Sequence, residues 1–122
     1  MPDRREIDNA IAAHAKWKVR LKQAIDTGKI DATVGVIRKD DQCDFGKWLK
    51  TLKLSATDPN TPHFNSIRGL HAQFHESAAR VAELALGGKK QDAEKAMAYG
   101  GDFTGVSSKL TSAMLEWKKS IG

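Results

Sequence analysis

The sequence predicts an all-α protein: an antiparallel four-helix-type bundle with an additional short helix that carries the Cys motif around Cys43. Over most of the chain, apolar residues recur at steps of three and four, which is the spacing of one helix face. Glycines and prolines gather between these periodic segments, where they favour turns. No segment alternates apolar and polar residues as a half-buried strand does. The one β-branched cluster, residues 33–37, leaves a short strand open as an alternative.

The first predicted helix covers residues 3–27. Gly28 follows it and is a plausible C-cap, because glycine readily adopts the left-handed conformation that ends many helices. The positions expected to share the inward face are Ile7, Ala10, Ile11, His14, Trp17, Leu21, Ala24 and Ile25.

Two short helices are expected next. The first covers about residues 30–39 and ends in a polar turn at residues 39–42. The second covers residues 43–52, with Phe45, Trp48, Leu49 and Leu52 at helical spacing. Residues 55–62 are expected to form a loop, because Pro59 and Pro62 lack backbone donors and restrict the residues before them.

A long helix is expected to begin near Thr61, with Thr61 as its cap and Pro62 in its first turn. Gly87 and Gly88 end it, and its inward face is Phe64, Ile67, His71, Phe74, Ala78, Val81 and Ala85. The last helix covers about residues 90–120. Because glycine weakens a helix interior, Gly100, Gly101 and Gly105 predict a kink or a close helix contact there.

Length and composition indicate one domain over residues 1–122, with a cytoplasmic location. The chain has no apolar stretch near the roughly 18 residues that a membrane helix needs, and no apolar signal core near its start. Its single cysteine excludes an intramolecular disulfide. The net charge of +5 comes from 20 basic and 15 acidic residues that alternate along the chain. That distribution is typical of a solvated surface and disfavours nucleic-acid binding.

Four possible metal ligands occupy informative positions. His14 and His71 lie on inward faces, and His75 follows His71 by four residues, so both imidazoles project from the same side of one helix. Each histidine alone is more often a core residue than a ligand, and a lone cysteine is more often a small buried apolar residue. Together with Cys43 they make four nitrogen and sulfur donors, the number and kind that a tetrahedral Zn²⁺ site requires. The fourth histidine, His63, is expected to be exposed or to neighbour the helix cap.

Three motifs resemble the chemoreceptor zinc-binding domain family, the CZB domains. They are His-Ala-Lys-Trp at residues 14–17, Cys-Asp-Phe-Gly-Lys-Trp-Leu at residues 43–49, and His-Ala-Gln-Phe-His at residues 71–75. The resemblance implies that zinc is bound by His14, Cys43, His71 and His75. It also implies a homodimer that controls a chemoreceptor signalling domain or a diguanylate cyclase, attached or separate.

The sequence indicates the residues around such a site less clearly than the ligands themselves. Trp17, Phe45, Trp48 and Phe74 are expected to form an apolar wall, with Gly46 allowing a close backbone approach beside the thiolate. The acidic residues that could orient an imidazole are Asp31, Asp40, Asp41, Asp44 and Glu76, and none is preferred over a capping or solvent-facing role.

A sensing function follows, rather than catalysis. Four protein ligands leave zinc no open position for a substrate, and the chain lacks a nucleophile triad or a phosphate-binding glycine loop. The input is either zinc itself or an oxidant such as hypochlorous acid acting on Cys43. A structural zinc-stabilised interaction module is the alternative. A haem or di-iron bundle is disfavoured, because the inward Glu-x-x-His pairs of di-iron sites are missing.

Overall fold

The computed structural model describes residues 4–30, 32–39 and 43–121, and the predicted turn at residues 39–42 therefore lies mostly outside the described residues. The described part contains no strand, so the all-α prediction is confirmed and the strand alternative at residues 33–37 is wrong. Its helices are α1 (Arg4–Thr27), α2 (Val34–Arg38), α3 (Asp44–Thr51), α4 (Thr61–Leu86), α5 (Lys90–Met97) and α6 (Asp102–Ile121).

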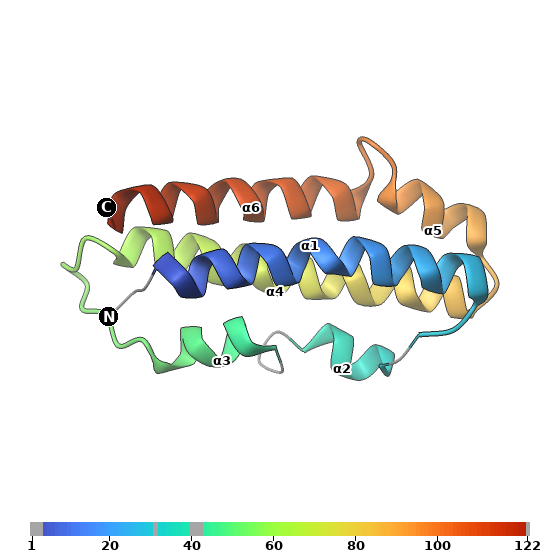
Figure 1. Ribbon diagram of the computed structural model, residues 1–122, viewed down its shortest axis with the longest axis horizontal. Coiled ribbons are helices and arrows are strands. Elements are labelled where there is room, and N and C mark those ends of the chain that lie inside the picture. Colours follow the sequence, from blue (N-terminus) through green and yellow to red (C-terminus); the bar gives the residue numbers. More distant parts are fainter. Residues whose placement is uncertain (1–3, 31, 40–42, 122) are drawn as a thin grey trace.

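The helices form four antiparallel columns (Figure 1). α1 and α4 run in one direction, whereas the α2–α3 pair and the α5–α6 pair run in the other. α3, which carries most of the Cys motif, shares a column with α2. α4 contacts every other described helix, so His71 and His75, which lie on its buried face, are close to the centre of the molecule.

The core consists largely of the predicted inward faces. In α1 the predicted positions are buried except Ile11 and Trp17, and in α4 they are buried except Phe64; these three are half-buried. Phe74 of α4 packs on Phe103 of α6, with ring centroids 5.3 Å apart. The buried apolar residues belong to one cluster that draws on every helix.

Several helix ends differ from the prediction. α2 begins only at Val34, because the Thr33 hydroxyl accepts a hydrogen bond from the Val36 N–H and caps the helix there. Thr61 is not the cap of α4: the cap residue is Asn60, and the Thr61 hydroxyl instead donates to the Ser55 carbonyl at 2.6 Å. The Asn60 side chain makes no capping bond, since its Oδ1 accepts from the Trp117 indole N–H at 3.1 Å.

The expected last helix is two helices, α5 and α6, so the predicted kink is a complete break. Gly100 has φ +83°, a left-handed conformation that a continuing helix does not contain. A Cβ at Gly101 would lie 2.3 Å from the Lys95 carbonyl oxygen, so this position tolerates no side chain without movement of the backbone. Gly105 lies inside α6 without interrupting it.

These glycines predict opposite effects on stability. Gly101→Ala is expected to lower the free energy of unfolding by about 1–3 kcal/mol, because the new methyl group meets backbone carbonyls that cannot rotate away. Gly105→Ala is expected to raise it by up to about 1 kcal/mol, because the added Cβ meets no atom within 4 Å and alanine favours the helix. Urea unfolding of both variants measures the difference. Equal effects would show that the α5–α6 connection has no close backbone approach.

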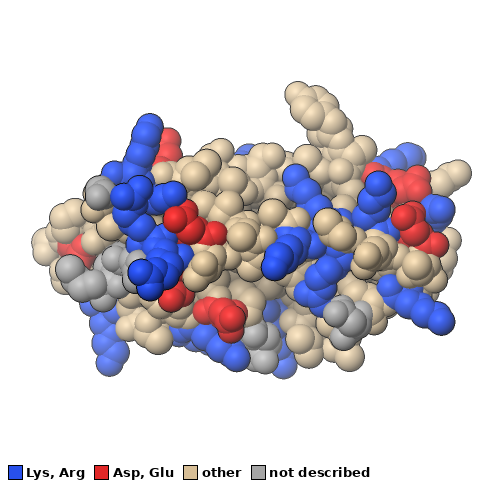
Figure 2. Space-filling model, viewed as in Figure 1, with Lys and Arg blue, Asp and Glu red and all other residues tan. Residues whose placement is uncertain are grey.

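The surface carries charge of both signs. On the face shown in Figure 2, basic and acidic side chains are interspersed with uncharged ones. Arg38 of α2 pairs with Glu76 and Glu83 of α4, and Lys118 of α6 pairs with Asp8 of α1. Among the described helices, none combines the length and apolar character needed to cross a membrane.

Candidate metal centre

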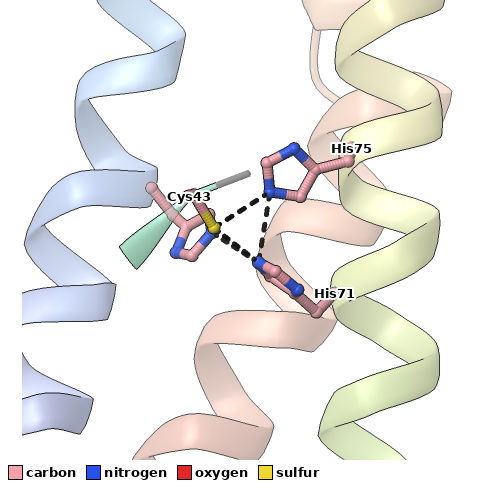
Figure 3. A group of neighbouring side chains, drawn as sticks. Cys43, His71 and His75 are labelled. Carbon is pink, nitrogen blue, oxygen red and sulfur yellow. Dashed lines mark hydrogen bonds between the residues drawn. The ribbon is translucent and has the colours of Figure 1, made fainter. Parts of the chain in front are cut away.

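The four predicted ligand residues meet at one point inside the bundle. His14 comes from α1, Cys43 directly precedes α3, and His71 and His75 come from successive turns of α4. One donor atom from each side chain lies within 4.8 Å of the other three. Figure 3 shows the Cys43 sulfur and the two α4 imidazoles pointing toward one another. Sequence spacing alone could place only the α4 pair together.

The donor-atom distances fit a small tetrahedral cation. His71 Nε2 lies 3.1 Å from the Nε2 atoms of both His14 and His75. Cys43 Sγ lies 3.3 Å from His71 Nε2 and 3.6 Å from His75 Nε2. Bonds of about 2.0–2.1 Å from Zn²⁺ to nitrogen and about 2.3 Å to sulfur, at tetrahedral angles, separate donor atoms by about 3.3–3.6 Å. The cluster has the donor types that zinc binds, and these four separations are close to those around the ion.

Backbone carbonyls determine which nitrogen of two histidines faces the cluster. His14 Nδ1 lies 2.7 Å from the Ala10 carbonyl oxygen, and His75 Nδ1 lies 2.9 Å from the Ile37 carbonyl oxygen. Because a carbonyl oxygen only accepts, both Nδ1 atoms carry the proton. In the neutral rings, each Nε2 then presents its lone pair to the centre of the cluster, as a metal ligand does.

The histidine contacts cannot all be hydrogen bonds. The Nε2 atoms of His14 and His75 both present lone pairs toward His71 Nε2, which carries at most one proton. A single N–H cannot make two linear bonds to separate acceptors. Converging lone pairs repel each other, and a cation at their centre removes that repulsion. This contact pattern is the strongest sign in the structure that the cluster is a metal site.

Cys43 has two roles at the start of α3. Its sulfur accepts a hydrogen bond from the Gly46 N–H at 3.3 Å, which is the N-cap interaction of α3. The same sulfur contacts the α4 histidines. The predicted second helix therefore begins at Asp44, with Cys43 as its cap rather than its first residue. Gly46 is buried and brings its backbone beside the sulfur, as the sequence predicts.

Burial keeps three of the candidate ligands, His14, Cys43 and His71, uncharged. Desolvation lowers the pKa of His71 to about 3, and the neighbouring His75 and His14 add to the shift. Desolvation likewise lowers the pKa of His14 to about 4, although the hydrogen bond to the Ala10 backbone opposes this shift. Both imidazoles are thus neutral at pH 7, the state that binds metal. Burial raises the pKa of the Cys43 thiol, against the effect of nearby backbone N–H groups, so a metal must displace its proton.

Aromatic rings enclose the cluster. Phe45 and Phe74 pack edge-on against His14, with centroid distances of 5.9 and 4.8 Å. Trp48 stacks on Phe45 at 5.7 Å, and Trp17 lies 6.4 Å from His75. All four members of the expected apolar wall are therefore present, with the two tryptophans in the outer positions.

Neither of the described acidic candidates orients an imidazole, and two peptide carbonyls take that role. Glu76 points to Arg38, with Oε2 and Nε 3.1 Å apart, and Asp44 is exposed; Asp31, Asp40 and Asp41 lie outside the described residues. The Ala10 carbonyl could have been anticipated, because it lies four residues before His14 in the same helix. The Ile37 carbonyl could not, because only the packing of α2 on α4 brings it to His75.

The remaining histidine lies away from the cluster. His63 is the third residue of α4 and is half-buried, eight residues before the first of the two α4 ligands. It is missing from the group of possible ligands found among the described residues. This placement agrees with the expectation that His63 neighbours the helix cap.

Comparison with known proteins agrees with this geometry. The family model of the chemoreceptor zinc-binding domain, CZB, matches residues 14–82, a stretch that contains all four candidate ligands. No curated protein and no solved structure gives a significant match. Because the family match covers more than half of the chain and the donor cluster suits zinc, this chain belongs to the chemoreceptor zinc-binding domain family.

Proposed function

We propose that this domain is a non-enzymatic sensor in which His14, Cys43, His71 and His75 hold Zn²⁺ and the state of the Cys43 sulfur is the signal. The observation that carries the proposal is the double role of that sulfur. It is both a donor atom of the cluster and the N-cap acceptor of α3. A chemical change at one atom would therefore alter the metal site and the start of a helix together.

Cys43 is the most accessible of the four side chains. The three histidines are 1–5 % exposed, whereas Cys43 is half-buried. A cavity of about 710 Å³ between α1 and the α2–α3 column is lined by Cys43, His14 and His75. A molecule as small as hypochlorous acid has room to approach the sulfur through this cavity, which the less exposed His14 and His75 also line.

The chemistry at the sulfur is a two-electron oxidation. Bound zinc would hold Cys43 as a thiolate, the nucleophilic form of the side chain. In the reaction with hypochlorous acid, the sulfur gains the hydroxyl group to form a sulfenic acid, two electrons pass to chlorine, and chloride leaves. Sulfenic acid is a poorer metal ligand and a poorer acceptor for the Gly46 N–H.

Release of the sulfur would loosen α3, whose remaining anchors are few. Phe45 and Leu49 are its buried apolar side chains, and Trp48 packs against Trp117 of α6 with ring centroids 5.8 Å apart. Trp117 lies near the end of α6, and the start of α1 lies at the same end of the bundle (Figure 1). Displacement of α3 is thus expected to shift α6 at the end of the bundle where a signalling module would connect.

Family membership supports the proposed outputs. A chemoreceptor signalling domain or a diguanylate cyclase, attached or separate, would receive the helix movement. A homodimer would allow two domains to act on one output.

Treatment with hypochlorous acid tests the sensor. One equivalent added to the zinc-loaded chain is expected to convert Cys43 to a sulfenic acid, seen by dimedone labelling and mass spectrometry, and to speed amide exchange in α3. Cys43→Ser is expected to bind zinc more weakly, keep its helical circular dichroism, and show no exchange response to the oxidant. Unchanged zinc retention and unchanged exchange in the oxidised parent chain would contradict sensing and favour a purely structural zinc module.

A further inference from the structure

A second cavity lies between α3 and α4, on another side of the metal cluster. Its volume is about 340 Å³, near the lower end of the range for small-molecule sites, and it suits a ligand of about ten non-hydrogen atoms. Leu49 and Leu52 line it from the α3 side, and Phe64 lines it from α4. The candidate ligand His71 forms part of its wall.

The charges around this cavity have one sign. Lys50 and Arg68 line it, both are exposed, and none of its described lining residues is acidic. The Arg68 guanidinium carbon lies 5.8 Å from the centre of the Phe64 ring, which places a cation beside the apolar wall. The larger cavity beside Cys43 differs, because Glu6 and Asp44 line it together with basic residues. An apolar interior with cations at its edge favours an amphipathic anion.

We propose that this cavity binds a small carboxylate with an apolar body, and that its occupancy is coupled to the metal centre. An apolar group would lie against Leu49, Leu52 and Phe64, with the carboxylate toward Arg68. Such a ligand bridges the helix capped by Cys43 and the helix that carries His71. Because a ligand stabilises the conformation whose cavity it fills, it favours the arrangement in which α3 is docked and the cluster is assembled.

The coupling rests on the proposed function, whereas binding to the cavity does not. Carboxylate binding is expected to raise zinc affinity severalfold. By thermodynamic reciprocity, zinc raises carboxylate affinity by the same factor. Binding is therefore measured on both zinc-free and zinc-loaded protein, so that the two ideas can fail separately.

Phenylacetate and phenylacetamide provide a matched test, because they share size and apolar body and differ in charge. Titrations followed by amide chemical shifts are expected to show phenylacetate binding about tenfold more tightly, with the largest shifts at the cavity residues of α3 and α4. Acetate, which has the charge without the apolar body, is expected to bind far more weakly than phenylacetate. Equal affinity for phenylacetate and its amide, or shifts located elsewhere, would overturn the proposal.

Two variants locate the interaction. Arg68→Gln is expected to weaken phenylacetate binding about threefold, since an exposed cation contributes modestly, and to leave phenylacetamide unchanged. Arg80→Gln is the control, because Arg80 is also exposed on α4 and does not line the cavity. An equal effect of both variants would refute a local charge contact. Equal phenylacetate affinity with and without zinc would overturn the coupling, and failure of the chain to take up zinc would instead overturn the proposed function.

Discussion

His71→Ala is expected to weaken zinc binding on the order of a hundredfold or more. His71 Nε2 lies within 3.1–3.3 Å of donor atoms from the other three residues, so it has the central position in the cluster. Structural zinc sites supply about 10–16 kcal/mol in binding free energy, and an equal share for one of four ligands is about 2.5–4 kcal/mol. Competition with a chromophoric zinc chelator at pH 7 measures this loss.

The matched control is His63→Ala. His63 lies on the same helix, is half-buried, and is outside the cluster. Its removal is expected to leave zinc affinity within about twofold of the parent value. Because His71→Ala also leaves a cavity in the core, thermal unfolding of both metal-free variants separates the cost to the fold from the loss of a ligand. Parent-like zinc affinity in folded His71→Ala would remove His71 from the site.

Acidification is expected to destabilise the zinc-free protein by about 3–4 kcal/mol between pH 7 and pH 5. In the folded chain, burial lowers the pKa of His14 to about 4 and that of His71 to about 3, against an ordinary value of 6.5 in the unfolded chain. Below about pH 6.5 the unfolded chain binds two protons that the folded chain does not. Stability is therefore full above pH 6.5 and falls as the pH decreases toward 4.

Urea unfolding at half-unit steps of pH measures this dependence. Two protons give a limiting slope of about 2.7 kcal/mol per pH unit near pH 5. The free energy of unfolding of a native protein is only about 5–15 kcal/mol. The metal-free chain is therefore expected to be close to unfolding at pH 4.5. A His14→Gln variant is expected to reduce the slope of the free energy of unfolding against pH toward the value for one proton. A stability that stays constant from pH 7 to pH 5 would show that the histidines are not held neutral by burial.

The zinc-loaded protein is expected to respond in the same direction at a different pH. Protons compete with a metal for the imidazole and thiolate donors, so acid both releases zinc and destabilises what remains. Zinc shifts the onset of unfolding to lower pH, because bound metal stabilises the folded state by mass action. The separation between the two pH profiles gives the contribution of zinc to stability.

Local patterning of the chain predicted most of its helices and their buried faces. The spacing of apolar residues in α1 and α4 determined which side of each helix is buried, since one face must cover the core. Gly28, Gly87 and Gly88 marked helix ends correctly, because glycine accepts conformations that end a helix at little cost. The predicted cap of α4, Thr61, was wrong, and the glycines at residues 100–105 predicted a kink or a close helix contact but not a complete break between α5 and α6. Asn60 is the cap residue but bonds to Trp117, 57 residues away, and the break at Gly101 reflects a close approach of α5 carbonyls.

The sequence by itself predicted the candidate donor set, because three motifs contain the histidines and the cysteine whose chemistry suits zinc. The i, i+4 spacing of His71 and His75 follows directly from helix geometry. Tertiary structure alone decided how His14 and Cys43 reach that pair, which peptide carbonyls orient the imidazoles, and that the Cys43 sulfur also caps α3. Periodicity specifies which face of a helix is buried, whereas the rotation and axial position of one helix against another depend on side-chain packing across the whole core.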